Sequence, residues 1–316
     1  MSTRASSPAG GRIDGTDAAL AARAAGGGLR DTLTRYYSLT KPGVLYGNAL
    51  TAAAGFALAS AGHFALWSFV VLCVGSTMVI ASACVINNVL DRDIDTVMER
   101  TRKRATVTGS VDVRGAVAFS IALGVVGMAM LIAWTNWWVV GVGVGGFVCY
   151  VWLYGMLSKR MSIHGTLVGS VSGAAPIFAG YLAVTGSIDI GAVIAFAIMF
   201  LWQMPEFYSI AIYRRDEYAH AGVPVITVIK GIPRTVREIL AYTVAFVVAT
   251  LLLPVFGYTG IVYTVVMGAL GLYWIWIGVL GLRAVDQAAW ARRMFRFSMV
   301  MILALCVMVA VGPVLP

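Results

Sequence analysis

Three long stretches of this sequence contain no Asp, Glu, Lys or Arg residue, and they limit the possible folds more than any other feature. They run from Pro42 to Leu90, from Gly115 to Ser158 and from Ile239 to Leu282. Because a helix that spans a bilayer needs about 20 apolar residues, each stretch accommodates two spans joined by a tight turn. Only 12% of the 316 residues are charged, against about 25% in soluble domains. The sequence therefore predicts an all-α polytopic membrane protein.

Hydropathy divides the chain into a polar N-terminal segment and a membrane domain. Residues 1–35 are expected to form a disordered cytoplasmic tail, because residues 1–30 are rich in Ala, Gly and Ser. Residues 36–316 are expected to form a single transmembrane domain. Its nine predicted transmembrane helices cover about residues 43–62, 66–90, 116–134, 137–157, 164–184, 188–212, 238–257, 260–282 and 296–315.

The basic residues lie on one side of this arrangement. All 23 Lys and Arg residues fall in the tail, in the loops after spans two, four, six and eight, or at the edge of a span. Asp189 is the only charged residue on the opposite side. The positive-inside rule therefore predicts a cytoplasmic N-terminus, four cytoplasmic loops and an external C-terminus. The two long loops, 91–115 and 213–237, are four spans apart, which predicts a four-plus-four helix pseudo-repeat around a central cavity.

An acidic cluster ends the second predicted span. Asn87, Asp91 and Asp95 are spaced i, i+4 and i+8, so on a helix they lie along one face, whereas the i+2 spacing of Asp93 favours solvent. Carboxylates at a helix C-terminus are disfavoured by the helix dipole unless a cation is present. Mg²⁺ typically binds one or two carboxylates together with substrate phosphate oxygens. The pattern therefore suggests a metal–phosphate site, and a solvated acidic helix end is the alternative.

Cationic residues accompany these carboxylates. Four of them lie between Arg100 and Arg104, directly after the aspartates, and Lys159 and Arg160 end the fourth span. Acids and arginines also occur together in residues 213–218, at the end of the sixth span. Guanidinium and ammonium groups bind phosphate oxygens, so two such clusters on equivalent spans favour a shared diphosphate site. The alternative is that these residues anchor the helix ends at the lipid headgroups.

The sixth predicted span carries a carboxylate well inside the membrane region. Glu206 follows Pro205, and because a charge inside a bilayer is costly, Glu206 is expected to face a polar cavity. The aromatic residues Tyr150, Tyr154 and Trp202 lie near the expected cavity, where their ring faces are suited to stabilising a carbocation. Helix packing is the alternative role for each of these rings.

The sequence pattern argues against two other classes of site. The four cysteines all lie inside apolar stretches and lack metal-ligand spacing, which argues against a zinc site or a disulfide framework. The net charge of +9 comes from membrane loops rather than from a basic face with interleaved aromatic residues, so no nucleic-acid partner is expected.

From about Leu39 to the last span, the sequence resembles the intramembrane UbiA-type prenyltransferases, and more narrowly their protoheme IX farnesyltransferase (haem O synthase) branch. The stretches that carry the resemblance are Leu39–Gly43, Asn87–Arg104, Gly165–Pro176, Leu201–Pro205 and Ala221–Gly231. The resemblance implies a helical membrane prenyltransferase domain and a divalent cation, Mg²⁺, as cofactor.

The resemblance also implies roles for individual residues. The implied Mg²⁺ ligands are Asn87, Asp91 and Asp95, which together with Asp216 are the implied catalytic residues. The implied diphosphate-binding residues are Arg100, Lys103, Arg104, Lys159, Arg214 and Lys230. The implied substrate-cavity residues are Asn48, Tyr150, Tyr154, Trp202, Gln203, Glu206 and Tyr208. The implied haem contacts are His164 and His220.

The activity that the resemblance implies is transfer of a farnesyl group from farnesyl diphosphate to a vinyl group of haem B. Water then adds, giving haem O, which serves terminal oxidases. The implied location is a bacterial inner membrane, with the active-site loops in the cytoplasm. The implied partners are the lipid bilayer and, as proteins, haem A synthase or terminal oxidase assembly factors.

The sequence departs from the family pattern at three places. Glu206 stands where the family usually has histidine, so any role of that histidine falls to Glu206. Ala105 stands where the family often has proline, and the second long loop has no clean Asp-x-x-x-Asp pattern, which leaves Asp216 as its candidate carboxylate.

Two alternative functions are open at this point. One is prenylation of an aromatic quinone precursor by the same fold, which the Met98–Thr101 sequence argues against. The other is secondary transport, for which ionisable residues are expected near the middle of the membrane. Here nearly all of them cluster at one face.

Overall fold

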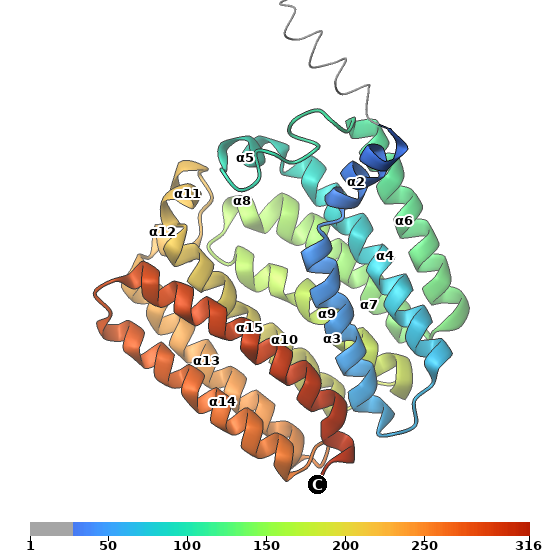
Figure 1. The fold of residues 1–316 in the computed structure, drawn as a ribbon, viewed down its shortest axis with the longest axis vertical. Coiled ribbons are helices and arrows are strands. Elements are labelled where there is room, and N and C mark those ends of the chain that lie inside the picture. Colours follow the sequence, from blue (N-terminus) through green and yellow to red (C-terminus); the bar gives the residue numbers. More distant parts are fainter. Residues whose placement is uncertain (1–27) are drawn as a thin grey trace, which may run out of the picture.

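The computed structural model describes residues 28–316, whose regular structure is entirely helical (Figure 1). Within these residues, nine segments are long and apolar enough to cross a membrane, so the predicted nine-span all-α fold is confirmed. They are α3 (Pro42–Ser60), α4 (Leu66–Leu90), α6 (Val113–Trp134), α7 with η1 and α8 (Trp137–Met161), α9 (Gly165–Thr185), α10 (Ile190–Tyr213), α13 (Ile232–Val255), α14 with η2 (Ile261–Arg283) and α15 with η3 (Gln287–Val314).

Short helices lie outside these spans, on the side that carries the basic loops. Helix α2 (Leu29–Leu39) precedes the first span, and α5 (Arg92–Val97), α11 (Arg215–His220) and α12 (Ile226–Ile229) lie in the two long loops. The tail prediction covered residues 1–35, of which residues 1–27 lie outside the described part of the chain. Residues 29–35 belong to helix α2 rather than to a disordered segment. This helix packs through Tyr36 against Phe119 of α6, with ring centroids 5.2 Å apart.

Two spans begin earlier than hydropathy predicted. Helix α13 starts at Ile232 instead of about residue 238, and α15 starts at Gln287 instead of about residue 296. A span predicted from hydropathy leaves out the charged first turns of these helices. Such turns are nevertheless helical, because a helix can continue beyond the apolar part of the membrane. In α15 the Asp286 carboxylate caps the helix by accepting a hydrogen bond from the Ala289 amide at 2.9 Å.

The spans form one bundle in which α3, α9, α10 and α15 occupy the middle (Figure 1). Helix α3 packs against α4, α9 and α15, while α10 packs against α9, α13 and α15. The pair α4–α6 in the first half corresponds to the pair α10–α13 in the second half, as a four-plus-four repeat requires. Buried side chains such as Ile177, Ile198, Phe246 and Met301 join these helices in one continuous core.

The contact between α3 and α9 depends on glycine. A Cβ atom on Gly180 would lie 2.1 Å from the Ala52 carbonyl oxygen, and one on Gly55 would lie 2.0 Å from the Ile177 carbonyl oxygen. Small residues let transmembrane backbones approach closely, which provides the packing that drives helix association in lipid. These two glycines therefore set the distance between the helices that line one side of the cavity described below.

Replacing Gly180 with alanine is expected to lower the free energy of unfolding by about 1–3 kcal/mol, because the new methyl group meets backbone that cannot move aside. Thermal denaturation of the purified protein in detergent measures this effect. Gly268→Ala in α14 is the matched control, since nothing lies within 4 Å of its added Cβ. Equal denaturation temperatures for the two variants would contradict the assigned packing.

Candidate active site

A cavity of about 600 Å³ lies between the helices and reaches the side of the protein that carries the basic loops. Its walls come from α3, α4, η1, α9, α10 and the two long loops. Most of the wall is apolar, and all but one of the acidic and basic lining residues come from helix ends and loops on that one side. These residues are Lys41, Asp91, Asp95, Arg100, Arg104 and Lys159, and the exception is Glu206 within α10. The cavity therefore suits a ligand with a long apolar part and an anionic head.

The acidic cluster lies where helix α4 ends. Helix α4 stops at Leu90, Asp91 has φ −87° and ψ 4°, and α5 begins at the next residue. The hydrogen-bond register nevertheless continues, because the Asp91 amide donates to the Asn87 carbonyl at 2.9 Å and the Asp95 amide donates to the Asp91 carbonyl at 2.8 Å. The three residues are only 1–2% exposed, and all three line the cavity.

Each of these three side chains has its own cationic partner. The Lys159 ammonium group donates to Oδ2 of Asp91 at 2.6 Å, and the Arg104 guanidinium donates to Oδ2 of Asp95 at 2.5 Å. Lys41 donates to Oδ1 of Asn87. The partners come from three separate parts of the chain, so the cluster is assembled by the fold rather than by one loop. Such charge-assisted hydrogen bonds are stronger than neutral ones.

Two buried polar atoms of the cluster have no hydrogen-bond partner among the described residues. They are Oδ1 of Asp91, which is an acceptor, and Nδ2 of Asn87, which is a donor. An unsatisfied buried polar group is costly, so both atoms point to a missing ligand. A divalent cation with bound phosphate oxygens would satisfy both atoms, since a carboxylate oxygen is a ligand that Mg²⁺ prefers and a phosphate oxygen accepts hydrogen bonds. The residues therefore fit Mg²⁺ together with a diphosphate.

The protein alone does not provide a complete metal site here. Among the described residues, no group of three or more His, Cys, Asp or Glu side chains is placed to hold a metal ion. Two carboxylates and one amide leave coordination positions open, which is the usual situation of Mg²⁺ bound through substrate phosphate groups. A cation held by these residues would therefore take further ligands from a bound anion.

Lys41 is a site residue that was not predicted. It has a left-handed backbone conformation (φ 56°, ψ 68°) directly before Pro42, and this turn directs the side chain into the cavity. The Asn88 amide group fixes the turn by donating to the Leu39 carbonyl at 2.8 Å. Burial lowers the pKa of Lys41 to about 8. The only signal in the sequence was a single lysine before the proline that opens the first span.

The fourth span ends in an unusual helix. Residues Cys149–Ser158 form the π-helix η1, a type that is rare and is frequently found at functional sites. Tyr150 and Tyr154 stack on one another with ring centroids 5.8 Å apart, and both line the cavity. Gly169 of α9 makes room for Tyr154, because a Cβ atom there would lie 3.0 Å from the Tyr154 ring. The two rings thus form an aromatic wall beside the acidic cluster.

Helix α10 contributes one polar strip to the cavity. Trp202, Gln203 and Glu206 all line it. Gln203 is held by hydrogen bonds to the Ser170 and Met199 carbonyls at 3.1 and 2.9 Å. No hydrogen bond or ion pair joins the Glu206 carboxyl group to any other described side chain. Glu206 is therefore free to interact with a ligand.

The prediction that Tyr208 lines the cavity requires a correction. Tyr208 is absent from the cavity wall and packs against Tyr242 of α13, with ring centroids 6.2 Å apart. Five residues along a helix correspond to a rotation of about 140°, so Tyr208 faces away from Gln203. By contrast, the predicted cavity residue Asn48 lines the wall and donates to the Val44 carbonyl at 2.8 Å.

Several other predicted site residues lie outside the cavity wall. Those with exposed side chains are Lys103, His164, Asp216, His220 and Lys230. Arg214 is half-buried but binds Glu217 at 2.9 Å instead of facing the cavity. The charge pattern identified the correct loops, but it does not show which side of a short loop helix faces inward.

The second long loop closes over the cavity through apolar residues. Tyr218 of α11 lines the cavity and was not predicted. It packs with a small cluster formed by Ile94 and Met98 of the first long loop and Val223 of the second. Burial raises the pKa of Tyr218, so its hydroxyl group stays protonated at neutral pH. The two loops therefore meet at the wall of the cavity that the acidic cluster also lines.

Similar proteins were found at the level of sequence. The chain is 45% identical over 279 residues to "Protoheme IX farnesyltransferase 2" of Pseudomonas fluorescens (strain Pf0-1), covering 88% of this chain and 95% of that protein. It is also 45% identical over 282 residues to "Protoheme IX farnesyltransferase" of Klebsiella pneumoniae subsp. pneumoniae, covering 89% of this chain and 96% of that protein.

Solved structures share the fold at lower sequence identity. A structure of digeranylgeranylglyceryl phosphate synthase matches with a TM-score of 0.77 and 17% identity, covering 90% of this chain and 99% of that one. A UbiA homolog from Archaeoglobus fulgidus bound to GPP and Mg²⁺ matches with a TM-score of 0.65 and 17% identity, covering 87% of this chain and 99% of that one.

The family model agrees with both comparisons. The model of the UbiA prenyltransferase family matches residues 48–301, which is most of the membrane domain and includes the acidic cluster. The chain belongs to the UbiA prenyltransferase family.

Proposed function

We propose that this protein transfers the farnesyl group of farnesyl diphosphate to a vinyl group of haem B, with addition of water, giving haem O and diphosphate. The observation that carries the proposal is the buried set Asn87, Asp91 and Asp95, which lies at the polar end of an apolar cavity and keeps unsatisfied polar atoms. The choice of haem B as acceptor is supported by relatives at 45% identity that are named protoheme IX farnesyltransferase.

The residues of this chain divide the chemistry between them. Asn87, Asp91 and Asp95 would hold Mg²⁺, which when bound supplies Lewis-acid stabilisation of the departing diphosphate. Lys41 and Lys159 already line the cavity beside these residues and are placed to bind diphosphate oxygens. Cations aimed at a leaving group stabilise the negative charge that develops on it in the transition state.

The remaining cavity wall suits the apolar and cationic parts of the reaction. The farnesyl chain would lie along the apolar wall between α3, α9 and α10. The stacked rings of Tyr150 and Tyr154 lie beside the acidic cluster, where an aromatic face favours a nearby carbocation. The loop contact between Met98 and Val223 covers this region and limits the access of water before the transfer.

The membrane setting follows from the charge distribution. The chain is an integral membrane protein, and we place it in a bacterial inner membrane with the basic loops in the cytoplasm. Haem O is consumed by haem A synthase or by terminal oxidase assembly, so those proteins are the proposed partners.

A purified-protein assay tests the choice of acceptor. The protein in detergent is incubated with farnesyl diphosphate, Mg²⁺ and an equimolar mixture of haem B and 4-hydroxybenzoate, and the products are separated and weighed by mass spectrometry. We expect only the haem to gain the mass of a farnesyl group plus a hydroxyl group, because the second hydrogen of the added water leaves as a proton. Farnesylation of the hydroxybenzoate alone would contradict the proposal and favour an aromatic prenyltransferase.

Glu206 gives a prediction within the same reaction. If its carboxylate accepts the proton of the attacking water, Glu206→Leu should lower turnover about 100-fold, the lower range for general acid–base catalysis. Glu206→His should retain most of the activity, because imidazole also accepts a proton and the family usually has histidine there. Initial rates of haem O formation measure both effects. A Glu206→Leu variant with wild-type turnover would remove Glu206 from the mechanism.

A further inference from the structure

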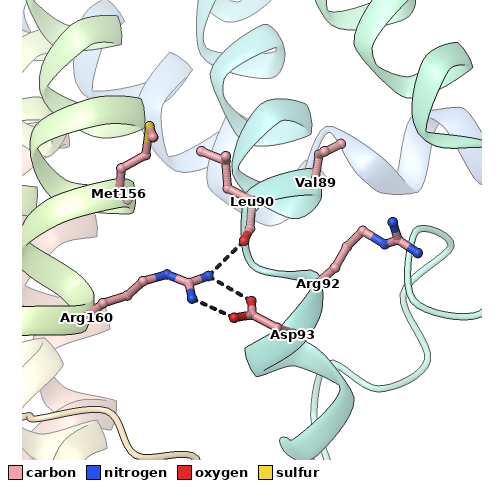
Figure 2. A pocket seen from close by; sticks show the side chains of 7 residues that line it. Val89, Leu90, Arg92, Asp93, Met156 and Arg160 are labelled. Carbon is pink, nitrogen blue, oxygen red and sulfur yellow. Dashed lines mark hydrogen bonds and ion pairs between the residues drawn. The ribbon is translucent and has the colours of Figure 1, made fainter.

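A single arginine binds both sides of the break between α4 and α5. The Arg160 guanidinium donates to Oδ2 and Oδ1 of Asp93 at 2.6 and 2.7 Å, and to the Leu90 carbonyl at 2.8 Å (Figure 2). The ion pair with Asp93 is bidentate, a geometry that fixes the orientation of the two side chains as well as their distance. The Leu90 carbonyl belongs to the last turn of α4, where carbonyl groups lack helical partners. Arg160 therefore supplies a missing hydrogen bond and an ion pair together.

The two residues that Arg160 contacts lie on either side of Asp91, a candidate metal ligand, along the chain. Leu90 is the last residue of α4, Asp91 forms the break, and Asp93 lies in the first turn of α5. The planar guanidinium group of Arg160 thus binds both Leu90, directly before Asp91, and Asp93, two positions after it. The angle between α4 and α5 decides whether Asp91 and Asp95 both face the cavity. Arg160 is placed to fix that angle.

Arg160 acts from outside the cavity. Arg160 and Asp93 line a separate, open cleft together with Val89, Arg92 and Met156 (Figure 2). Neither Arg160 nor Asp93 belongs to the wall of the large cavity. The side chains are 32% and 64% exposed, and exposed ion pairs contribute little to global stability. The pair is therefore better suited to a local role than to holding the fold together.

The preceding residue reaches the same break from the cavity side. Lys159 binds Asp91 at 2.6 Å, while Arg160 binds Asp93. Consecutive residues of a helix point about 100° apart, so the short helix α8 holds the break from two directions. η1 packs against α4 at Gly155, where a Cβ atom would lie at an ordinary van der Waals distance of 3.5 Å from Nδ2 of Asn87. The end of the fourth span thus binds the acidic segment at two successive aspartates, Asp91 and Asp93.

We propose that the Arg160–Asp93 pair is a positioning element that orients Asp91 and Asp95 toward the bound diphosphate and its cation. The proposal rests on the proposed function only in taking a prenyl diphosphate as the ligand of the acidic cluster. It assigns to Asp93 a role outside the cavity, as a partner of Arg160 rather than a metal ligand. Partners that orient metal ligands in this way strongly affect the affinity of the site.

Binding of an unreactive analogue tests this inference without turnover. Calorimetry measures the affinity of the full-length protein for farnesyl thiodiphosphate with Mg²⁺, in the absence of haem. Arg160→Gln is expected to weaken this binding about 10- to 100-fold. Asp93→Asn is expected to weaken it less, because it leaves the hydrogen bond from Arg160 to the Leu90 carbonyl in place. Since both changes remove the same ion pair, the double variant should bind no more weakly than Arg160→Gln alone. In turnover assays the KM for farnesyl diphosphate should rise more than kcat falls.

Two further variants separate positioning from general damage. Arg160→Lys keeps the positive charge but cannot form the bidentate pair, so it should recover only part of the affinity for the analogue. Arg234→Gln is the matched control, because it removes a surface ion pair of 2.6 Å with Glu238 on α13 and should leave binding unchanged. Wild-type affinity in Arg160→Gln, or single effects that multiply in the double variant, would overturn the inference. A wild type that binds the analogue but leaves haem unmodified would contradict the proposed function alone.

Discussion

Asp91→Ala is expected to lower the rate of haem O formation by about 10³-fold, the upper range for removing one group that stabilises charge in a transition state. Asp91 is 1% exposed, binds Lys159 and keeps Oδ1 without a partner among the described residues, so the variant loses the atom best placed to hold the cation. The amount of protein in the membrane should not change, because the nine spans remain intact. Initial rates and immunoblots of membranes measure the two quantities.

The control for this variant is Glu99→Gln. Glu99 lies in the same loop, is exposed, and approaches Arg102 only at 3.9 Å, so its charge has no link to the cavity. We expect wild-type rates for this control. Near-normal farnesylation by Asp91→Ala would contradict the assignment of the cation to the acidic cluster, whatever the acceptor.

Lys159→Ala is expected to lower kcat/KM for farnesyl diphosphate about 100-fold, because a cation beside the departing diphosphate is lost. The ion pair with Asp91 is mostly buried, and removal of one partner leaves the other charge without compensation. Raising the Mg²⁺ concentration should recover part of the activity, since a metal ion then compensates Asp91. Steady-state kinetics over a range of Mg²⁺ concentrations measures both effects.

The matched control is Arg237→Ala. Arg237 is an exposed cation on the same side of the protein, on α13 and outside the cavity wall. If both variants lose activity equally, the loss reflects the total basic charge of that side. A loss confined to Lys159→Ala supports a specific diphosphate contact.

The membrane fold and the position of the acidic cluster could be predicted almost completely from the sequence. Long uncharged stretches have few possible structures in a bilayer, because backbone groups must form their hydrogen bonds within helices. The spacing of Asn87, Asp91 and Asp95 placed three side chains on one face, and the hydrogen-bond register persists through the break at Asp91. These features depend on local periodicity, which a sequence records directly.

The contacts between distant segments were harder to predict. Lys41 enters the site through a left-handed turn, and Tyr218 through the inner face of a six-residue helix. Neither conformation is encoded in hydropathy or charge. Asp216, which the charge pattern favoured, lies on the exposed side of the same short helix. The π-helix that brings Lys159 to Asp91 likewise depends on packing between spans rather than on its own sequence pattern.

The most direct measurement is haem analysis of a host that lacks its own farnesyltransferase. The wild-type protein is expressed in that host beside the Asp91→Ala variant, and extracted haems are separated and identified by mass spectrometry. We expect haem O, heavier than haem B by a farnesyl group and a hydroxyl group, with the wild type and only haem B with the variant. Haem B alone with well-expressed wild-type protein, or haem O with both proteins, would contradict it.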